Sequence, residues 1–152
     1  VMTDGTVLLL PDGQEAKAFH IRDGLALAWA RRAGLMTGIL SGRASEAVAR
    51  RAAELGMSVV RQGVRDKGLV FRDILAEHKL APHEVAYVGD DVNDLPVLRE
   101  VGLSAAPADA AFEVRSEAFM ITEARGGQGC LREFLEAVLR ARGDWDRFVR
   151  EG

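Results

Sequence analysis

The chain has 152 residues, of which 48% are hydrophobic and 28% are charged, and this composition supports one globular domain with a substantial core. Its net charge of −3, without any basic run interleaved with aromatic side chains, argues against a nucleic-acid partner. The apolar stretches are far shorter than a membrane span and no signal peptide is visible, so we expect no membrane partner.

Residues 6–19 predict a β-hairpin. Two short segments, 6–10 and 15–19, flank Pro11-Asp12-Gly13-Gln14, and both proline and Asp-Gly are strong turn formers. The first arm, TVLLL, is unusually apolar for an exposed ribbon. It therefore packs either on the domain itself or on another subunit.

The rest of the chain alternates between helical and strand patterns. Helices are predicted at residues 23–33, 44–55, 93–101 and 131–139, and in the segment that Asp66 caps and Pro82 ends; short strands are predicted at 35–40, 57–60, 85–88, 103–106 and 118–121. This alternation predicts an α/β fold with a parallel sheet covered by helices on both faces. Ligands of such sheets bind beyond the carboxyl ends of the strands, so the residues after each strand are the candidate site.

Two of these positions are suited to an anion. Ser41-Gly42-Arg43 follow one predicted strand, and a serine hydroxyl, nearby N–H groups and a guanidinium can all contact phosphate oxygens; the alternative is an ordinary capped turn. Lys67 lies in the first turn of its helix, where the helix dipole disfavours a cation. It is therefore either a solvated lysine or one that faces an anion at the same end of the sheet.

Three acids, Asp90, Asp91 and Asp94, lie within five positions after the strand at 85–88, in VAYVGDDVNDLPVL. Repulsion and desolvation oppose such neighbouring carboxylates unless a cation offsets them, and Mg²⁺ prefers oxygen ligands. The alternative is an N-cap, in which Asp91 or Asn93 caps the following helix. A cap accounts for one of the acids more easily than for three.

The combination is more informative than any of its parts. A phosphate-binding turn at Ser41, a cation at Lys67 and a metal site at Asp90 would all lie at one end of the sheet. This arrangement predicts phosphoryl transfer or the hydrolysis of a phosphate ester.

In this order, Ser41-Gly42-Arg43, Lys67 and Gly89-Asp90-Asp91 resemble motifs two, three and four of the haloacid dehalogenase superfamily. The stretches FHIRDG at 19–24, ILSGR at 39–43, VAYVGDD at 85–91 and RGGQG at 125–129 more specifically resemble the capless 3-deoxy-D-manno-octulosonate 8-phosphate phosphatases. The similarity runs in order through essentially all 152 residues.

The resemblance implies a single domain over residues 1–152, with a Rossmann-like three-layer α/β/α fold and no cap domain. The hairpin at 6–19 would protrude from it, and a tail would occupy 143–152. It implies a Mg²⁺-dependent phosphatase that hydrolyses a phosphorylated keto sugar acid through an aspartyl-phosphate. Subunits would form a homotetramer in which the hairpins help to close neighbouring active sites. A cytoplasmic location fits the single Cys130, which cannot form an internal disulfide.

The resemblance also assigns roles by position. Ser41 would bind the transferring phosphoryl group, Lys67 would stabilise its charge, and Asp90 would bind Mg²⁺ directly. Asp91 and Asp94 would act without binding the metal directly, by contacting water and Lys67. The substrate would contact a wider set of residues: His20, Arg22, Asp23, Gly24, Gly42, Arg43, Arg51, Gly126 and Gly127.

The sequence departs from the family pattern in three places. The family's first motif, Asp-x-Asp-Gly, would directly precede Val1, and Asp4 does not replace it; we expect an omitted N-terminal segment, the alternative being a catalytically dead homologue with an oligomerisation or regulatory role. Ala28 and Gln128 stand where basic residues are frequent, which favours a 9-phosphorylated nonulosonate as an alternative substrate.

In the tail, Trp145 and Phe148 either pack on the last helix or reach a neighbouring site.

Overall fold

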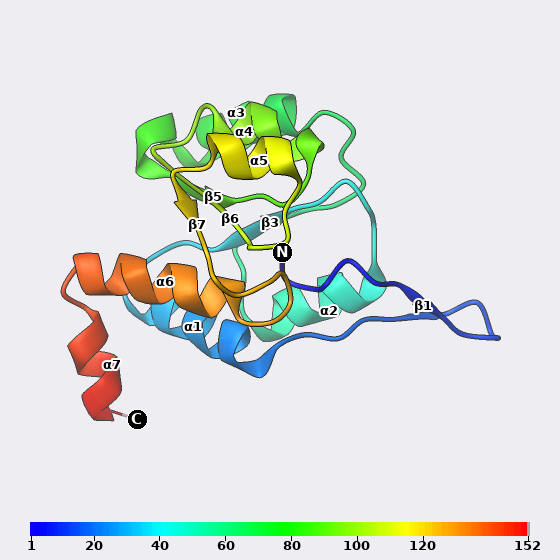
Figure 1. Ribbon diagram of the computed structural model, residues 1–152, viewed down its shortest axis with the longest axis horizontal. Coiled ribbons are helices and arrows are strands. Elements are labelled where there is room, and N and C mark those ends of the chain that lie inside the picture. Colours follow the sequence, from blue (N-terminus) through cyan, green and yellow to red (C-terminus); the bar gives the residue numbers. More distant parts are fainter. Residues whose placement is uncertain (152) are drawn as a thin grey trace.

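The computed structural model describes residues 1–151, which form three layers (Figure 1). The middle layer contains the parallel strands β3 (Gly38–Leu40), β4 (Val59–Arg61), β5 (Ala86–Val88), β6 (Leu103–Ala106) and β7 (Met120–Ile121). Helices α3 (Lys67–His78), α4 (Leu95–Leu98) and α5 (Phe112–Glu117) cover one face, and α1 (Ile21–Arg32), α2 (Glu46–Glu54) and α6 (Cys130–Ala141) cover the other. The predicted α/β class and the two covered faces are confirmed.

Within residues 1–151 the parallel strands form two hydrogen-bonded groups. β3 pairs with β4, while β5, β6 and β7 pair in that order. Within residues 1–151 no strand pairs with both β3 and β5, which is why the two groups remain separate. All pairings within each group are parallel, so within each sheet the carboxyl ends of the strands lie along one edge.

Side-chain caps fix the start of two helices that lead away from the strand ends. The Asp66 carboxylate accepts the N–H of Leu69 at 2.9 Å, as the sequence predicted, and the Ser45 hydroxyl accepts the N–H of Val48 at 3.4 Å. The helix predicted at 93–101 is shorter than expected. A 3₁₀ turn at Val92–Asp94 comes first, and only Leu95–Leu98 is α-helical.

The core lies mainly between α1, α6 and the sheet of β5–β7. Ala26 and Ala30 of α1 are fully buried against Phe134 and Leu135 of α6, and Ala105 of β6 closes the cluster. The small residues of α1 let α6 approach closely, so the fold here is set by size complementarity as well as by apolar burial. No helix in residues 1–151 combines the length and apolar character that crossing a bilayer requires.

The tail forms a helix of its own, α7 (Trp145–Glu151), which packs on α1 and α6. The Trp145 ring meets Trp29 edge-on at 5.4 Å, and the Phe148 ring stacks on Trp29 at 5.6 Å. The Arg132 guanidinium lies 4.8 Å from both indole rings, in cation–π geometry. Of the two alternatives for Trp145 and Phe148, packing on the last helix is the one observed; residue 152 lies outside the described residues.

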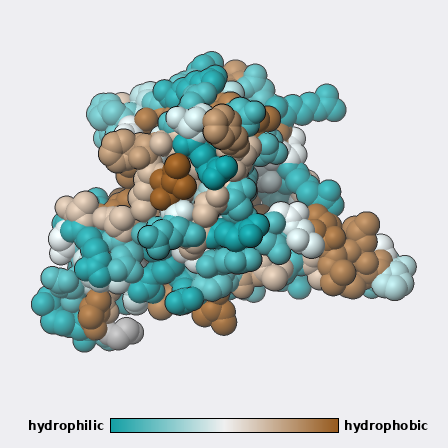
Figure 2. Space-filling view, in the orientation of Figure 1, coloured by the Kyte–Doolittle hydropathy of each residue, from teal (hydrophilic) through white to brown (hydrophobic). Residues whose placement is uncertain are grey.

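The predicted hairpin is present and protrudes from the domain (Figure 1). Its paired residues are β1 (Leu8–Leu9) and β2 (Glu15–Ala16), in antiparallel register. Leu8 and Leu9 are 59% and 73% exposed, so the apolar arm does not pack on its own domain. Figure 2 shows these side chains as an apolar patch on the projecting arm.

Candidate active site

The loops after β3 and β5 and the start of α3 meet at the carboxyl ends of the strands. The Lys67 ammonium at the start of α3 contacts Oδ1 of Asp94 at 2.6 Å. Beside them, a Cβ added to Gly42 would lie 3.5 Å from the Asn93 amide nitrogen, which places the Ser41-Gly42-Arg43 turn against the turn after β5. The structure therefore brings Ser41, Lys67 and the acids of residues 90–94 to one place.

Asp94 is the centre of this arrangement, and its carboxylate is 2% exposed. Oδ1 accepts hydrogen bonds from Lys67 and from the Tyr87 hydroxyl, the latter at 2.5 Å. Oδ2 accepts the backbone N–H groups of Asp90 at 3.1 Å and Asp91 at 3.2 Å. Burial alone would raise the pKa of Asp94, but the hydrogen bonds from Lys67 and Tyr87 outweigh it and hold that pKa below its usual range.

Asp90 and Asp91 face outward from this centre. Asp91 Oδ1 accepts the N–H of Val92 at 2.8 Å, so the capping interpretation of this acid is correct for a 3₁₀ turn. The Asp90 carboxylate is 42% exposed and pairs with the α-amino group of Val1.

A cavity of about 380 Å³ opens over Asp90 and is lined by Thr3, Asp4, Gly5, Asp90, Asp91, Asp109, Ala111 and Gly126. Every polar side chain in this lining, a threonine and four aspartates, carries oxygen atoms only, which suits Mg²⁺, an ion that binds one or two carboxylates and keeps several waters. Within residues 1–151 no group of three or more His, Cys, Asp or Glu side chains is arranged as a metal cage. The residues present therefore fit a Mg²⁺ ion held by Asp90 and water.

The Ser41 turn is compact and its hydroxyl is used locally. Ser41 Oγ donates to the Arg43 carbonyl at 2.9 Å and accepts the Arg43 N–H at 3.3 Å. The Arg43 guanidinium donates to Glu15 of the hairpin at 2.7 Å. Both alternatives for this turn stand, because a locally bonded hydroxyl can still rotate to a phosphate oxygen.

The glycine-rich loop at 125–129 lies beside the cavity. The loop's position depends on Asp109, whose carboxylate accepts the Gly126 N–H at 2.8 Å. Burial alone would raise the pKa of Asp109, but this hydrogen bond and the contact with Arg125 outweigh it and hold that pKa below its usual range. Gly127 has φ 68°, and a Cβ there would lie 2.4 Å from the Asp4 backbone nitrogen. Only glycine fits this approach.

Several predicted substrate residues serve the fold in this structure. Asp23 is 3% exposed, and its two oxygens accept the N–H groups of Gly129 at 3.3 Å and Arg132 at 2.8 Å, which caps α6. A Cβ on Gly24 would lie 2.3 Å from an Arg51 guanidinium nitrogen, so Gly24 makes room for that side chain.

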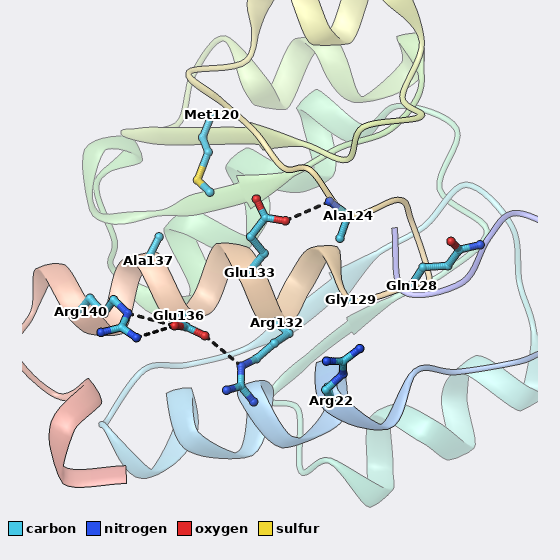
Figure 3. A pocket seen from close by; sticks show the side chains of 10 residues that line it. All are labelled: Arg22, Met120, Ala124, Gln128, Gly129, Arg132, Glu133, Glu136, Ala137 and Arg140. Atoms are coloured by element: carbon cyan, nitrogen blue, oxygen red, sulfur yellow. Dashed lines mark hydrogen bonds and ion pairs between the residues drawn. The ribbon is translucent and has the colours of Figure 1, made fainter. Parts of the chain in front are cut away.

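Arg22 lies away from the acids, on a larger cavity of about 480 Å³ between α1, α6 and the 120–129 segment. Figure 3 shows Arg22 and Gln128 at one end of this cavity and the Arg140–Glu136 pair at the other. His20, whose buried Nδ1 makes no hydrogen bond within residues 1–151, lies next to Gly129. The smaller cavity carries the acids and is the better candidate for chemistry.

Residues 10–102 match the family model of haloacid dehalogenase-like hydrolases. The chain belongs to the haloacid dehalogenase-like hydrolases. It is 39% identical over 146 residues to the 3-deoxy-D-manno-octulosonate 8-phosphate phosphatase of Escherichia coli K12, covering 96% of this chain and 78% of that one. The similarity of this hydrolase to the phosphatase thus extends over nearly its whole length, as the sequence motifs predicted.

Solved structures agree with this membership. The 3-deoxy-D-manno-octulosonate 8-phosphate phosphatase of Moraxella catarrhalis, in complex with magnesium, phosphate and KDO, superposes with a TM-score of 0.97 at 34% identity, over 99% of this chain and 87% of that one. A probable YrbI-family phosphatase of Pseudomonas syringae gives 0.96 at 44% identity, over 99% and 85%. The described residues of this hydrolase therefore adopt the haloacid dehalogenase fold over nearly their whole length.

Sequence reasoning missed two residues of this site, Tyr87 and Asp109. Tyr87 lies in the strand predicted at 85–88, and a tyrosine in a buried strand needs a partner for its hydroxyl. That need was the available signal. Asp109 gave no signal, since it follows a weak strand and its partner Gly126 lies 17 residues further along the chain.

Proposed function

We propose that this hydrolase is a Mg²⁺-dependent phosphatase whose substrate is 3-deoxy-D-manno-octulosonate 8-phosphate. The observation that carries the proposal is the buried Lys67–Asp94 pair beside Asp90, at the strand ends of a chain 39% identical to a phosphatase of that substrate. The structurally similar Moraxella catarrhalis protein is a phosphatase of the same name, in complex with magnesium, phosphate and KDO. Site, relatives and neighbours all support one reaction.

In this account the chain's own residues bind and polarise the phosphoryl group. The Lys67 ammonium gives one N–H to Asp94 and has two left for phosphoryl oxygens. The Ser41 hydroxyl, by rotating away from the Arg43 carbonyl, would contact the same group. Magnesium, when bound at Asp90, would supply charge for the phosphoryl oxygens and the developing transition state.

The nucleophile of the aspartyl-phosphate reaction belongs to the family's Asp-x-Asp-Gly motif, which does not occur in residues 1–152. Activity is therefore measured on the full-length gene product with its natural N-terminus. The role of the residues described here is binding, charge stabilisation and orientation, which is distinct from the covalent step.

We also propose that the protein forms homotetramers through its hairpins and works in the cytoplasm. Support for assembly is the apolar arm, where Leu8, Leu9 and Leu10 are 59%, 73% and 38% exposed. Sedimentation of the wild type and of a Leu8→Ser/Leu9→Ser variant tests it: dissociation of a tetramer by the variant is expected, and a monomeric wild type would reject it. Support for the compartment is the single, unpaired Cys130.

A substrate panel tests the reaction. Phosphate release should be fastest from 3-deoxy-D-manno-octulosonate 8-phosphate, slower from 9-phosphorylated nonulosonates, and absent after EDTA treatment. Ala28 and Gln128 make the nonulosonates the informative comparison, since fewer cations are available for the carboxylate. Release that is unaffected by EDTA would reject the mechanism, and faster release from a nonulosonate would reject the substrate.

A further inference from the structure

Tyr87, the only tyrosine of the chain, occupies the middle of β5. Its ring packs against two clusters of buried side chains, one around Leu98 and Val114 and the other around Phe71 and Val97. Its hydroxyl leaves these apolar groups and donates to Oδ1 of Asp94 at 2.5 Å. Packing alone would accept phenylalanine here, so the hydroxyl is the feature that needs an explanation.

The oxygen that Tyr87 contacts is the same oxygen that holds Lys67. Lys67 reaches Oδ1 from α3 and Tyr87 reaches it from β5, while Oδ2 accepts the two backbone N–H groups of the Asp90–Asp91 turn. A carboxylate offers about four acceptor positions, and all are used here. Asp94 cannot turn without breaking a contact to one of three segments.

This geometry determines where the Lys67 charge lies. An ammonium group on a flexible four-carbon stem has little orientation of its own, so the carboxylate that it contacts fixes its place. Without the Tyr87 hydroxyl, Oδ1 would be restrained by Lys67 alone, and only the two backbone N–H groups on Oδ2 would still anchor the carboxylate to the protein backbone. The hydrogen bond of the Tyr87 hydroxyl goes to Asp94, so Tyr87 acts on the lysine through that carboxylate.

We propose that Tyr87 is a positioning residue, whose hydroxyl fixes the Asp94 carboxylate and thereby the Lys67 ammonium that faces the phosphoryl group. The proposal rests on the phosphatase function proposed above. It predicts that removing one oxygen atom from the middle of a strand, without opening a cavity, lowers turnover while leaving substrate binding intact.

The first test is Tyr87→Phe in the full-length gene product, assayed with Mg²⁺ and 3-deoxy-D-manno-octulosonate 8-phosphate. We expect kcat to fall about tenfold, because the Lys67 charge is less well placed for the transition state. KM should be unchanged, because the variant loses no contact to the bound substrate. The matched control is Val101→Ala, which removes methyl groups from the cluster that Tyr87 also touches and should lower thermal stability without changing kcat. An unchanged kcat in Tyr87→Phe, or an equal fall in Val101→Ala, would overturn the proposal.

The second test needs no catalysis. Urea unfolding of Tyr87→Phe, Lys67→Met and the double variant forms a cycle, and sharing one carboxylate oxygen predicts non-additive effects, by at least about twofold in the unfolding equilibrium constant. Additive effects would overturn the link between the two side chains. A wild type inactive on every phosphate ester would overturn the proposed function, whereas equal activities of the wild type and Tyr87→Phe would overturn only the role of Tyr87.

Discussion

The contact between Asp94 and Lys67 makes Asp94→Ala the most informative change to stability. Side-chain exposure is 2% for Asp94 and 8% for Lys67, so the pair lies almost completely out of water. Truncating Asp94 would leave the Lys67 ammonium buried without a counter-ion and the Tyr87 hydroxyl without its acceptor.

The magnitude follows from these two losses. Breaking a buried ion pair by removing one partner costs about 3–5 kcal/mol, and an unsatisfied buried hydroxyl adds about 1–3 kcal/mol. We expect the free energy of unfolding to fall by roughly 4–6 kcal/mol, because the two losses share one carboxylate and are not additive. That is a large part of the total stability of a typical domain.

Urea unfolding, followed by circular dichroism, measures this loss. The double variant Asp94→Ala/Lys67→Met removes the uncompensated charge as well and should regain much of the stability, though not the activity. Glu117→Ala is the matched surface control: it breaks the two-bond pair with Arg99, at 2.6 Å for each bond, where both partners are solvated. Its effect should be a small fraction of that of Asp94→Ala.

Two results would refute this reasoning. One is an Asp94→Ala variant that is no less stable than Glu117→Ala, since burial would then not matter. The other is a double variant less stable than Asp94→Ala alone, which would show that Lys67 remains favourable in the core without its partner. Either result would place the stabilisation outside the Lys67–Asp94 contact.

Three further outcomes follow from single residues. Because the pKa of Asp94 is lowered on folding, its contribution to stability is present above about pH 4 and is lost as pH falls further. Asp94→Asn should therefore flatten the dependence of the urea midpoint on pH below that value. An unchanged slope would contradict this. Burial raises the pKa of the Cys130 thiol to about 11, so a thiol reagent at about pH 8 should label the native protein slowly and the urea-unfolded protein fast; equal rates would show an open thiol. Gly127→Ala should lower both stability and kcat/KM by more than Gly143→Ala. Both glycines have positive φ, but of the two only a Cβ at Gly127 would collide with backbone, that of Asp4. Equal effects would show that backbone strain, and not this collision, accounts for the loss.

The alternation of strands and helices was readable from the sequence because the buried stripes of the long helices are strong. In α6, Leu131, Phe134, Leu135 and Leu139 recur at helical spacing and all are buried. The helix α5 was missed because it has six residues and buries one of them, Val114. A single buried side chain gives no period to detect.

The site was predictable in outline because parallel strands end along one edge, which places Ser41, Lys67 and Asp90 near one another. Its internal contacts were not, because they join segments far apart in the chain. Asp23 caps a helix that begins more than a hundred residues later, with Arg132 at a separation of 109, and it was predicted from resemblance to be a substrate residue. Residue type and spacing do not show which partner a buried carboxylate selects.

The Asp90 carboxylate carries the central claim, a Mg²⁺-dependent phosphatase. The most direct measurement is phosphate release from 3-deoxy-D-manno-octulosonate 8-phosphate across a Mg²⁺ titration, for the full-length wild type, Asp90→Asn and Asp73→Asn. Asp73 is an exposed acid of α3, so Asp73→Asn is a control that makes the same chemical change away from the site. The account predicts saturable Mg²⁺-dependent release by the wild type and Asp73→Asn and none by Asp90→Asn; wild-type Mg²⁺ dependence in Asp90→Asn would contradict it.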